Sequence, residues 1–253
     1  MIKTRKKAKN KYRETVILSG FFLIASLFIG CGSNITENQK IISPESKLNL
    51  ASKNFDQVVG LALAGDKQQL RHRLQQGKSI DVVDEQGRSA VLVVTIHNDM
   101  NALQLLIELG ADVDFYDKAL STKVIDQTAF LYAGAHGMNE ALILLIDAGA
   151  KPDIYNYYEG TALIPAAEKG HVDTVKLLLE KSKIDIDHVN RPGWTALMEA
   201  VISSDGGDVI HQQIIKLLLA HGADSSIADK EGISALEHAQ KRGHSAVVEL
   251  LRQ

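Results

Sequence analysis

The stretch that decides the fold is GTALIPAAEKGHVDTVKLLL, residues 160–179. It holds two short apolar segments, and the pair Gly170-His171 separates them. Thr161 precedes the first segment, where a hydroxyl side chain can accept hydrogen bonds from the free N–H groups of a helix start. Gly170 can adopt the positive φ that commonly ends a helix. The stretch therefore predicts two helices joined by a tight turn, with the leucines at 177–179 on the seam between them.

The same pattern recurs along the chain. A serine or threonine followed by alanine opens each copy, and a small residue follows at the same distance after the alanine in three copies and further away in a fourth. The opening pairs are Ser89-Ala90, Thr128-Ala129, Thr161-Ala162, Thr195-Ala196 and Ser234-Ala235, and the later markers are Gly110, Gly149, Ser182 and the more distant Gly222. The two middle intervals between opening pairs are about 33 residues, and the first and last intervals are longer. Self-similarity at such a spacing indicates an array of stacked structural units.

These residues resemble the ankyrin repeat, whose period is about 33 residues. The resemblance runs from near Phe55 to Gln253 and includes an irregular first copy, in which Gln57 precedes Ala90 by one such period. It implies an all-α solenoid of about six helix-turn-helix units with β-hairpin-like fingers between them, the first and last units serving as caps. Small residues such as Ala166 and Ala167 then allow neighbouring first helices to approach closely.

Two copies are longer than the rest. The extra residues fall at 118–127, in one finger, and at 203–211, between the two helices of the fifth unit. Insertions in a repeat array lie in loops, often on the binding face. For Ser203–Gly207, binding and neutral drift in an exposed loop are equally good interpretations. For 118–127, binding is favoured because finger tips line the concave surface of an ankyrin array.

The first 30 residues have the layout of a secretory signal. Seven basic residues and one acid precede Val16–Gly30, an uncharged run rich in Leu, Ile and Phe. As a helix this run reaches about 22 Å, short of the ~30 Å hydrocarbon core, so a permanent membrane span is the weaker interpretation. The run ends in FIGC, and Cys31 is the only cysteine of the chain.

This ending resembles the lipobox of bacterial lipoproteins, in which the cysteine is lipidated and becomes the new N-terminus. It departs from the family pattern in having Phe28 where leucine is usual. Gly32, rather than aspartate, follows the cysteine, which in enteric-type lipoproteins implies release to the outer membrane. The predicted parts are a lipoprotein signal peptide at 1–30, a lipidated N-terminus and flexible tether at 31–53, and an ankyrin domain at 54–253. Pro44 disfavours helix within the tether.

The charge of the chain argues against nucleic-acid partners. Outside the first 30 residues there are 21 basic and 30 acidic side chains, a net charge of −9. Phosphate backbones and anionic headgroups repel such a surface, so we expect contact with the membrane through the N-terminal lipid only.

No pattern in the sequence indicates catalysis. None of the nine histidines stands four residues from another, the spacing at which two histidines on a helix hold a metal. Neither a G-x-S-x-G nucleophile motif nor a G-x-x-x-x-G-K phosphate loop occurs. We therefore expect no enzyme, no metal and no cofactor.

The resemblance instead implies a protein-binding surface, formed by the fingers and the polar ends of the first helices. Tyr, Trp and Arg dominate binding hot spots because they bury large area at modest entropic cost. The candidate binding residues are Arg88, Tyr157, Tyr158, Glu159, Arg191 and Trp194 in the fingers, and His136 and Lys169 on the helices. The alternative is that Trp194 packs on the neighbouring finger and that the tyrosines only stabilise the turn.

These features predict a lipid-anchored interaction module of the bacterial cell envelope, held at the outer membrane, facing the periplasm and binding a protein partner. An immunity protein that neutralises a secreted toxin is the main alternative, because the acidic balance suits a basic toxin. An envelope hydrolase and a host-directed effector are weaker hypotheses. A clustered set of His, Asp or Ser would favour the hydrolase, and the signal and lipobox argue against the effector.

Overall fold

The computed structural model describes residues 44–117, 128–204 and 207–252, which belong to one compact unit. Within these ranges the chain forms twelve helices, which pair into six helix-turn-helix units. Units one to three are α1 (Pro44–Leu63) and α2 (Lys67–Gln75), α3 (Ala90–Ile96) and α4 (Met100–Glu108), α5 (Ala129–Ala135) and α6 (Asn139–Asp147). Units four to six are α7 (Leu163–Glu168) and α8 (Val172–Lys181), α9 (Ala196–Ser203) and α10 (Val209–Ala220), α11 (Ala235–Arg242) and α12 (Ser245–Leu251). The predicted all-α solenoid of six units is confirmed.

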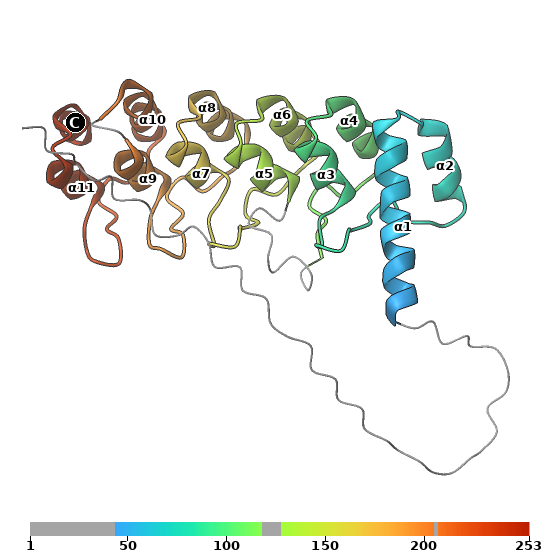
Figure 1. Cartoon of the computed structure of the whole chain (residues 1–253). Helices are drawn as coiled ribbons and strands as arrows, with labels where there is room; N and C mark the ends of the chain where they lie inside the picture. The colour runs from blue at the N-terminus through green and yellow to red at the C-terminus, as the bar shows by residue number, and fades with distance from the viewer. Residues whose placement is uncertain (1–43, 118–127, 205–206, 253) are drawn as a thin grey trace, which may run out of the picture. The chain divides into compact units, whose positions relative to one another are not determined.

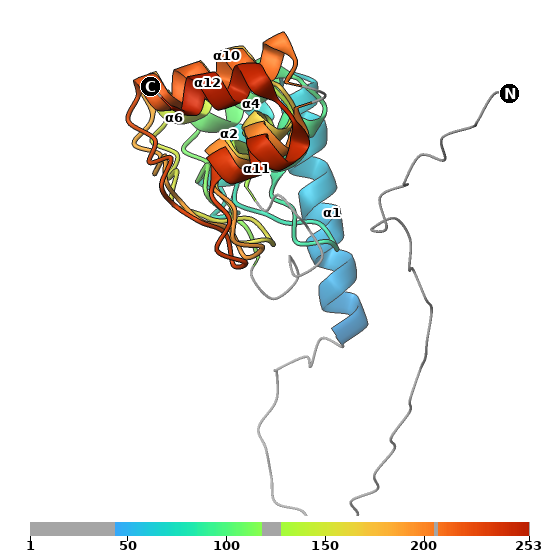
Figure 2. The same ribbon diagram turned by 90° about the vertical axis from the view of Figure 1, so that its left-hand side faces the viewer.

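The helices of this unit lie in two layers (Figure 1). Each first helix packs against the first helix of the next unit, as α5 does on α7 and α7 on α9, and the second helices from α4 to α10 follow the same rule. Seen along the stack, the described parts of the loops that join the units project to one side as fingers (Figure 2). One hydrophobic core runs through all six units. Each unit therefore buries its apolar faces mainly against its neighbours, as a solenoid requires.

In five of the six described units, a residue with a positive φ lies within two positions after the end of the first helix. Gly170 ends α7 with a φ of 77°, as predicted. The equivalent residue of unit two is Asn98, with a φ of 55°, and asparagine is among the side chains that tolerate this conformation best. In unit five the equivalent Ser204 has a φ of −61°, because the inserted residues carry the chain to α10 by a longer route.

The predicted helix caps are confirmed in four copies and wrong in one. Ser89, Thr128, Thr195 and Ser234 each accept a hydrogen bond from the N–H three residues later. Thr161 does not cap α7, because the helix begins at Leu163 and the buried Thr161 Oγ1 has no hydrogen-bond partner. The cause is Pro165, which has no N–H to donate to the Thr161 carbonyl, so the first helical hydrogen bond is missing.

The predicted tether overlaps a helix. We expected residues 31–53 to lack helix, with Pro44 discouraging it, but α1 begins at Pro44 and continues into unit one. Proline is tolerated in the first turn of a helix, because the N–H groups there have no intrahelical acceptor. The expectation for Pro44 was therefore wrong, since its position in the helix decides its effect.

The structure describes most of one predicted insertion and none of the other. Most of the insertion at 203–211 is described, and it lengthens α10 at its start, where the Asp208 side chain accepts a hydrogen bond from the His211 N–H. The insertion at 118–127 lies outside the described residues. So does Cys31, together with the predicted signal peptide.

The first unit contains an arginine where the other units have a core leucine. Arg73 occupies the position of Leu106, Leu145, Leu178 and Leu218, all of which are fully buried. Arg73 is itself only 8% exposed, and its Nη1 donates to Gln57 Oε1. Its Nε and Nη2 have no hydrogen-bond partner. A buried guanidinium with two unsatisfied donors destabilises the cap of the array.

We expect Arg73→Leu combined with Gln57→Ala to raise the free energy of unfolding by about 1–3 kcal/mol. The double variant places leucine at position 73 and alanine at position 57, as the later units have at the equivalent positions. Urea unfolding followed by circular dichroism measures the change, with Arg71→Leu on the exposed face of α2 as the control. A less stable double variant would mean that the buried guanidinium has compensating contacts.

Candidate functional site

The finger turns are built by an aspartate or asparagine that the sequence analysis overlooked. Asn156 Oδ1 accepts hydrogen bonds from the N–H groups of Tyr158 and Gly160, and Asn190 Oδ1 accepts from that of Trp194. Asp84 and Asp229 do the same in their fingers. Each of these residues stands five positions before the opening Ser or Thr of a copy, a regularity that was readable in the sequence. Such side-chain bonds hold the tip residues in one geometry.

The α6–α7 finger (residues 154–161) and the α8–α9 finger (residues 188–195) are joined by an inter-finger cluster. Its members are Tyr155, Tyr157, Tyr158, Glu159, His188 and Arg191. The Arg191 N–H donates to the Tyr158 carbonyl at 2.7 Å, and Arg191 Nη2 lies 3.0 Å from Glu159 Oε1. His188 Nε2 lies 2.6 Å from the Glu159 carbonyl oxygen. The backbones and side chains of the two fingers are therefore connected, which limits their independent motion.

Aromatic rings cover this cluster. The Arg191 guanidinium lies 5.3 Å from the Tyr157 ring centre, and the Tyr157 and Tyr158 rings meet edge to face at 5.3 Å. Tyr155 stacks on His188 at 4.3 Å. Tyr157 and Tyr158 remain 46% and 47% exposed. The structure thus brings together four of the predicted binding residues, Tyr157, Tyr158, Glu159 and Arg191, as an exposed and ordered aromatic surface.

Glu159 has a backbone conformation that favours glycine. Its φ is 59°, and the equivalent residues of other fingers are Gly87, Gly193 and Gly232. A side chain in this region costs about 1 kcal/mol or more. The Glu159 carboxylate bonds to Arg191 from this strained position. Backbone strain retained at an exposed tip is a reason to look there for function.

The other predicted residues lie apart from the cluster. Arg88 is held by Asp84 of its own finger, with Nε 2.6 Å from Oδ2. Trp194 follows the α8–α9 finger tip and is half-buried against the hydrophobic core. This burial gives Trp194 contacts with the core, and the alternative that it packs on the neighbouring finger stays a prediction.

His136 and Lys169 lie at the ends of adjacent first helices. Lys169 Nζ donates to the Ala135 carbonyl at 2.7 Å, and the His136 ring stacks on Tyr132 at 3.9 Å. Burial and the nearby Lys169 ammonium lower the pKa of His171, while its hydrogen bond to the Ala135 backbone opposes that shift. The Lys169 contact links α7 to α5, whereas His136 stacks on a residue of its own helix, so both predicted residues have structural contacts beside any contact with a partner.

A pair of carboxylates lies between α7 and α9. Glu199 on α9 is only 8% exposed. Burial and, to a smaller extent, the charge of Glu168 raise the pKa of Glu199 to about 7, and a hydrogen bond with Asn190 opposes the shift. Glu168, at the end of α7, is exposed and belongs to the polar ends of the first helices. The carboxyl groups of Glu168 and Glu199 are therefore close enough for the charge of one to affect the other.

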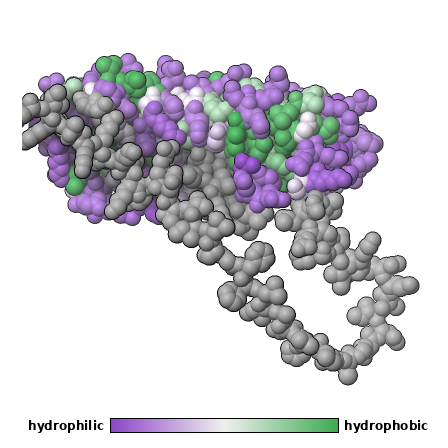
Figure 3. Space-filling view, in the orientation of Figure 1, coloured by the Kyte–Doolittle hydropathy of each residue, from purple (hydrophilic) through white to green (hydrophobic). Residues whose placement is uncertain are grey.

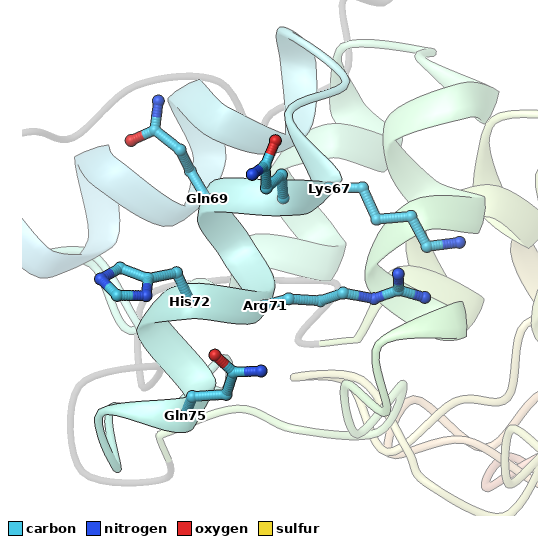
Figure 4. Close-up of a pocket in the computed structure, with 6 residues that line it drawn as sticks. Lys67, Gln69, Arg71, His72 and Gln75 are labelled. Atoms are coloured by element: carbon cyan, nitrogen blue, oxygen red, sulfur yellow. The ribbon is translucent and has the colours of Figure 1, made fainter.

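No other feature of the described residues brings together as many interacting side chains as the inter-finger cluster. A shallow depression on α2 is lined by Lys67, Gln68, Gln69, Arg71, His72 and Gln75 (Figure 4). All six residues come from one helix at the end of the array, which is the arrangement of a solvated helix face. In the described ranges, no three His, Cys, Asp or Glu side chains are grouped as metal ligands. Nor does any described helix combine the length and apolar character needed to cross a membrane.

Comparisons with known proteins agree with this architecture. The family model for ankyrin repeats (3 copies) matches residues 130–229. The chain is 35% identical to YahD of Escherichia coli (strain K12), which is named as an ankyrin repeat protein, over 75% of this chain and 91% of that one. Among solved structures, the ankyrin repeat protein EF0377 is 37% identical, with a TM-score of 0.69, over 79% of this chain and 98% of that one. An ankyrin repeat domain from Acinetobacter baumannii AYE is 42% identical, with a TM-score of 0.69, over 78% and 96%.

Proposed function

This chain belongs to the ankyrin repeat family, and we propose that it is a lipid-anchored module that binds another protein in the bacterial cell envelope. The inter-finger cluster is the observation that carries the binding part of the proposal. It presents exposed tyrosines beside an arginine, the residue types that dominate binding hot spots. Its contacts hold these side chains before a partner arrives, which reduces the entropic cost of binding.

Photo-crosslinking in the native cells tests the binding surface. Tyr158→p-benzoylphenylalanine is expected to form an adduct with one protein. The control places the same group at Ile143, an exposed residue of the second helix α6. A cross-link of equal yield at Ile143, or none at Tyr158, would contradict binding through the fingers.

Glu159→Gly separates the binding role from stability. Glycine relieves the positive φ, and the lost ion pair is exposed and worth less than about 1 kcal/mol. We therefore expect the free energy of unfolding to stay constant or to rise by up to about 1 kcal/mol. The Tyr158 cross-link is expected to fall several-fold, because Arg191 and its neighbours lose their fixed positions. An unchanged cross-link would mean that Glu159 has no part in binding.

The anchor rests on the sequence around Cys31. A basic segment, a short apolar run and a lone cysteine at its end support a lipoprotein signal, and acylation with more than one chain suffices for stable anchoring. We expect Cys31→Ser to abolish labelling by an alkyne fatty acid and to move the protein out of the membrane fraction. If labelling and fractionation are unchanged in this variant, the lipoprotein proposal is wrong.

A second candidate function is toxin immunity, and the net charge of −9 beyond the first 30 residues favours it. An acidic surface attracts a basic hydrolase and speeds its association. The protein cross-linked at Tyr158 is then expected to be a basic secreted toxin whose activity falls when this protein is added. A partner without toxin activity would exclude the immunity function, and the protein would then be a scaffold that binds another envelope protein.

A further inference from the structure

The insertion of unit five bonds to the units on both sides of it. Toward unit six, Ser204 Oγ lies 3.0 Å from His244 Nδ1, and a Cβ on Gly207 would lie 3.5 Å from His244 Cβ. Toward unit four, His211 Nε2 lies 3.1 Å from the Glu168 carbonyl oxygen at the end of α7. The insertion therefore connects three successive units beside the ends of their first helices.

The bond to unit six needs no charge. The Ser204 hydroxyl donates to the Val201 carbonyl at 2.9 Å, so its oxygen accepts from the Nδ1–H of His244. A neutral imidazole with its proton on Nδ1 meets this requirement. This contact therefore persists when the pH rises.

The bond to unit four needs a charged ring. His211 Nδ1 lies 2.8 Å from Asp208 Oδ2, and Nε2 faces the Glu168 carbonyl. A carboxylate and a carbonyl only accept, and a neutral imidazole has one N–H, so only the imidazolium donates to both partners. The His211 side chain is 12% exposed, so water replaces a lost bond poorly. A ring nitrogen without its proton would then face an acceptor, which costs free energy.

Asp208 is the charged group that bonds to this ring. In the parts of the chain that the structure describes, the ring has no hydrogen bond or ion pair beyond those with Asp208 and the Glu168 carbonyl. The turn after α7 carries Lys169, whose Nζ bonds to the Ala135 carbonyl, and His171, whose pKa burial lowers. The other charged side chains on helices that pack against α10 are Asp173, Lys176, Glu180 and Lys181 on α8, Glu199 on α9, and Glu249 on α12.

The same contact positions an apolar turn. Val209 and Ile210 begin α10 and are the most exposed large hydrophobic side chains among the described residues, at 68% and 52%. On the face shown in Figure 3, hydrophobic residues gather over α10 within a mainly hydrophilic surface. Ile210 Cγ2 lies 3.0 Å from the place that a Cβ on Gly170 would take, so this turn packs on unit four beside His211.

We propose that Asp208, His211 and the Glu168 carbonyl form a pH-dependent clamp between units four and five. At low pH the imidazolium joins the two acceptors and holds the start of α10 against the end of α7. Histidine changes charge between about pH 5 and 8. The protonated ring has two partners in the folded chain and the neutral ring has one, so the stability that the clamp contributes is present at low pH and is lost as the pH rises. Loss of the proton releases the apolar turn from unit four. The clamp goes beyond the proposed function and does not depend on it.

Amide hydrogen exchange of the full chain without its signal peptide tests the clamp. The informative N–H groups are those of His211 and Gln212, which donate to Asp208 Oδ1 and to the Asp208 carbonyl. Their protection is corrected for the intrinsic exchange rate at each pH. Between pH 6 and pH 8 we expect it to fall at least about fivefold more than that of the His244 N–H on the other side of the insertion.

Asp208→Asn separates the charge from the contact. The amide oxygen still accepts from the His211 N–H, and the amide N–H can donate to an unprotonated Nδ1, so a neutral ring keeps its Nε2–H for Glu168. We expect this variant to keep its protection at pH 8 and to lose the pH dependence. Glu199 and His171 titrate in both proteins, so their effects cancel in the comparison.

Two histidine variants and the state of the ring complete the test. His211→Gln is expected to be poorly protected at both pH values. His221→Gln, at the other end of α10, is expected to behave as the unaltered chain does, because its ring bonds within its own helix. Nitrogen NMR of the unaltered chain is expected to show two protonated nitrogens on the His211 ring at pH 6. A neutral ring at pH 6, or the same pH dependence in Asp208→Asn or His211→Gln as in the unaltered chain, would overturn the clamp.

Discussion

Gly134→Ala is expected to lower the free energy of unfolding by about 2–3 kcal/mol, although alanine is the better helix former. A Cβ at Gly134, on α5, would lie 2.6 Å from the Ala162 Cβ and 3.2 Å from the Ala162 carbonyl oxygen. Backbone atoms cannot move aside as the end of a flexible side chain can. The α5–α7 seam must therefore open, which weakens the contact between units three and four. Urea unfolding measures the loss.

Gly60→Ala is the matched control, because Gly60 is also helical and nothing lies within 4 Å of its added Cβ. This variant is expected to gain about 0.5–1 kcal/mol from helix propensity. Adding Ala162→Gly to Gly134→Ala removes the shortest contact and is expected to restore part of the loss. Equal effects of the two glycine substitutions would contradict close packing at this seam.

The free energy of unfolding is expected to fall by about 3 kcal/mol between pH 4.5 and pH 8 through Glu199 alone. Burial and the Glu168 charge raise the pKa of Glu199 from 4.5 to about 7. The folded protein thus binds more protons than the unfolded chain between these two values. Stability from the neutral carboxyl is complete below pH 4.5 and is lost as the pH rises through 7.

Glu199→Gln isolates this contribution, because the amide keeps the shape and can bond to Asn190 without titrating. The variant is expected to be more stable than the unaltered protein at pH 8 and similar to it at pH 4.5, as measured by urea unfolding at each pH. His171, whose pKa is lowered by burial, affects stability in the opposite direction, so the relevant quantity is the difference in unfolding free energy between the variant and the unaltered protein. A difference that does not change with pH would show that Glu199 titrates normally.

Part of the candidate site could be predicted because finger tips are marked by local sequence. Tyr157, Tyr158, Glu159 and Arg191 lie just before an opening Ser or Thr-Ala pair, which predicts their place in finger tips, and the structure joins them. The unfavourable backbone conformation of Glu159 could also be predicted from the sequence, because other fingers have glycine at this position. The bond from Lys169 to the Ala135 carbonyl could not be predicted, because it depends on how α5 and α7 pack together. The stacking of His136 on Tyr132 joins residues four positions apart on one helix, so it follows from local helix geometry.

The sequence by itself determined the repeat, its number of copies and most of its turns, because caps, positive-φ residues and small seam residues act within a few positions of each other. Gly170 and Ser234 are examples, and both behave as their neighbours in sequence predict. Only the tertiary structure decided which side chains of different units meet. Glu199 beside Glu168, and Gly134 against Ala162, are pairs whose members belong to successive units of the array. Their contacts depend on how closely neighbouring first helices pack, which no local spacing specifies.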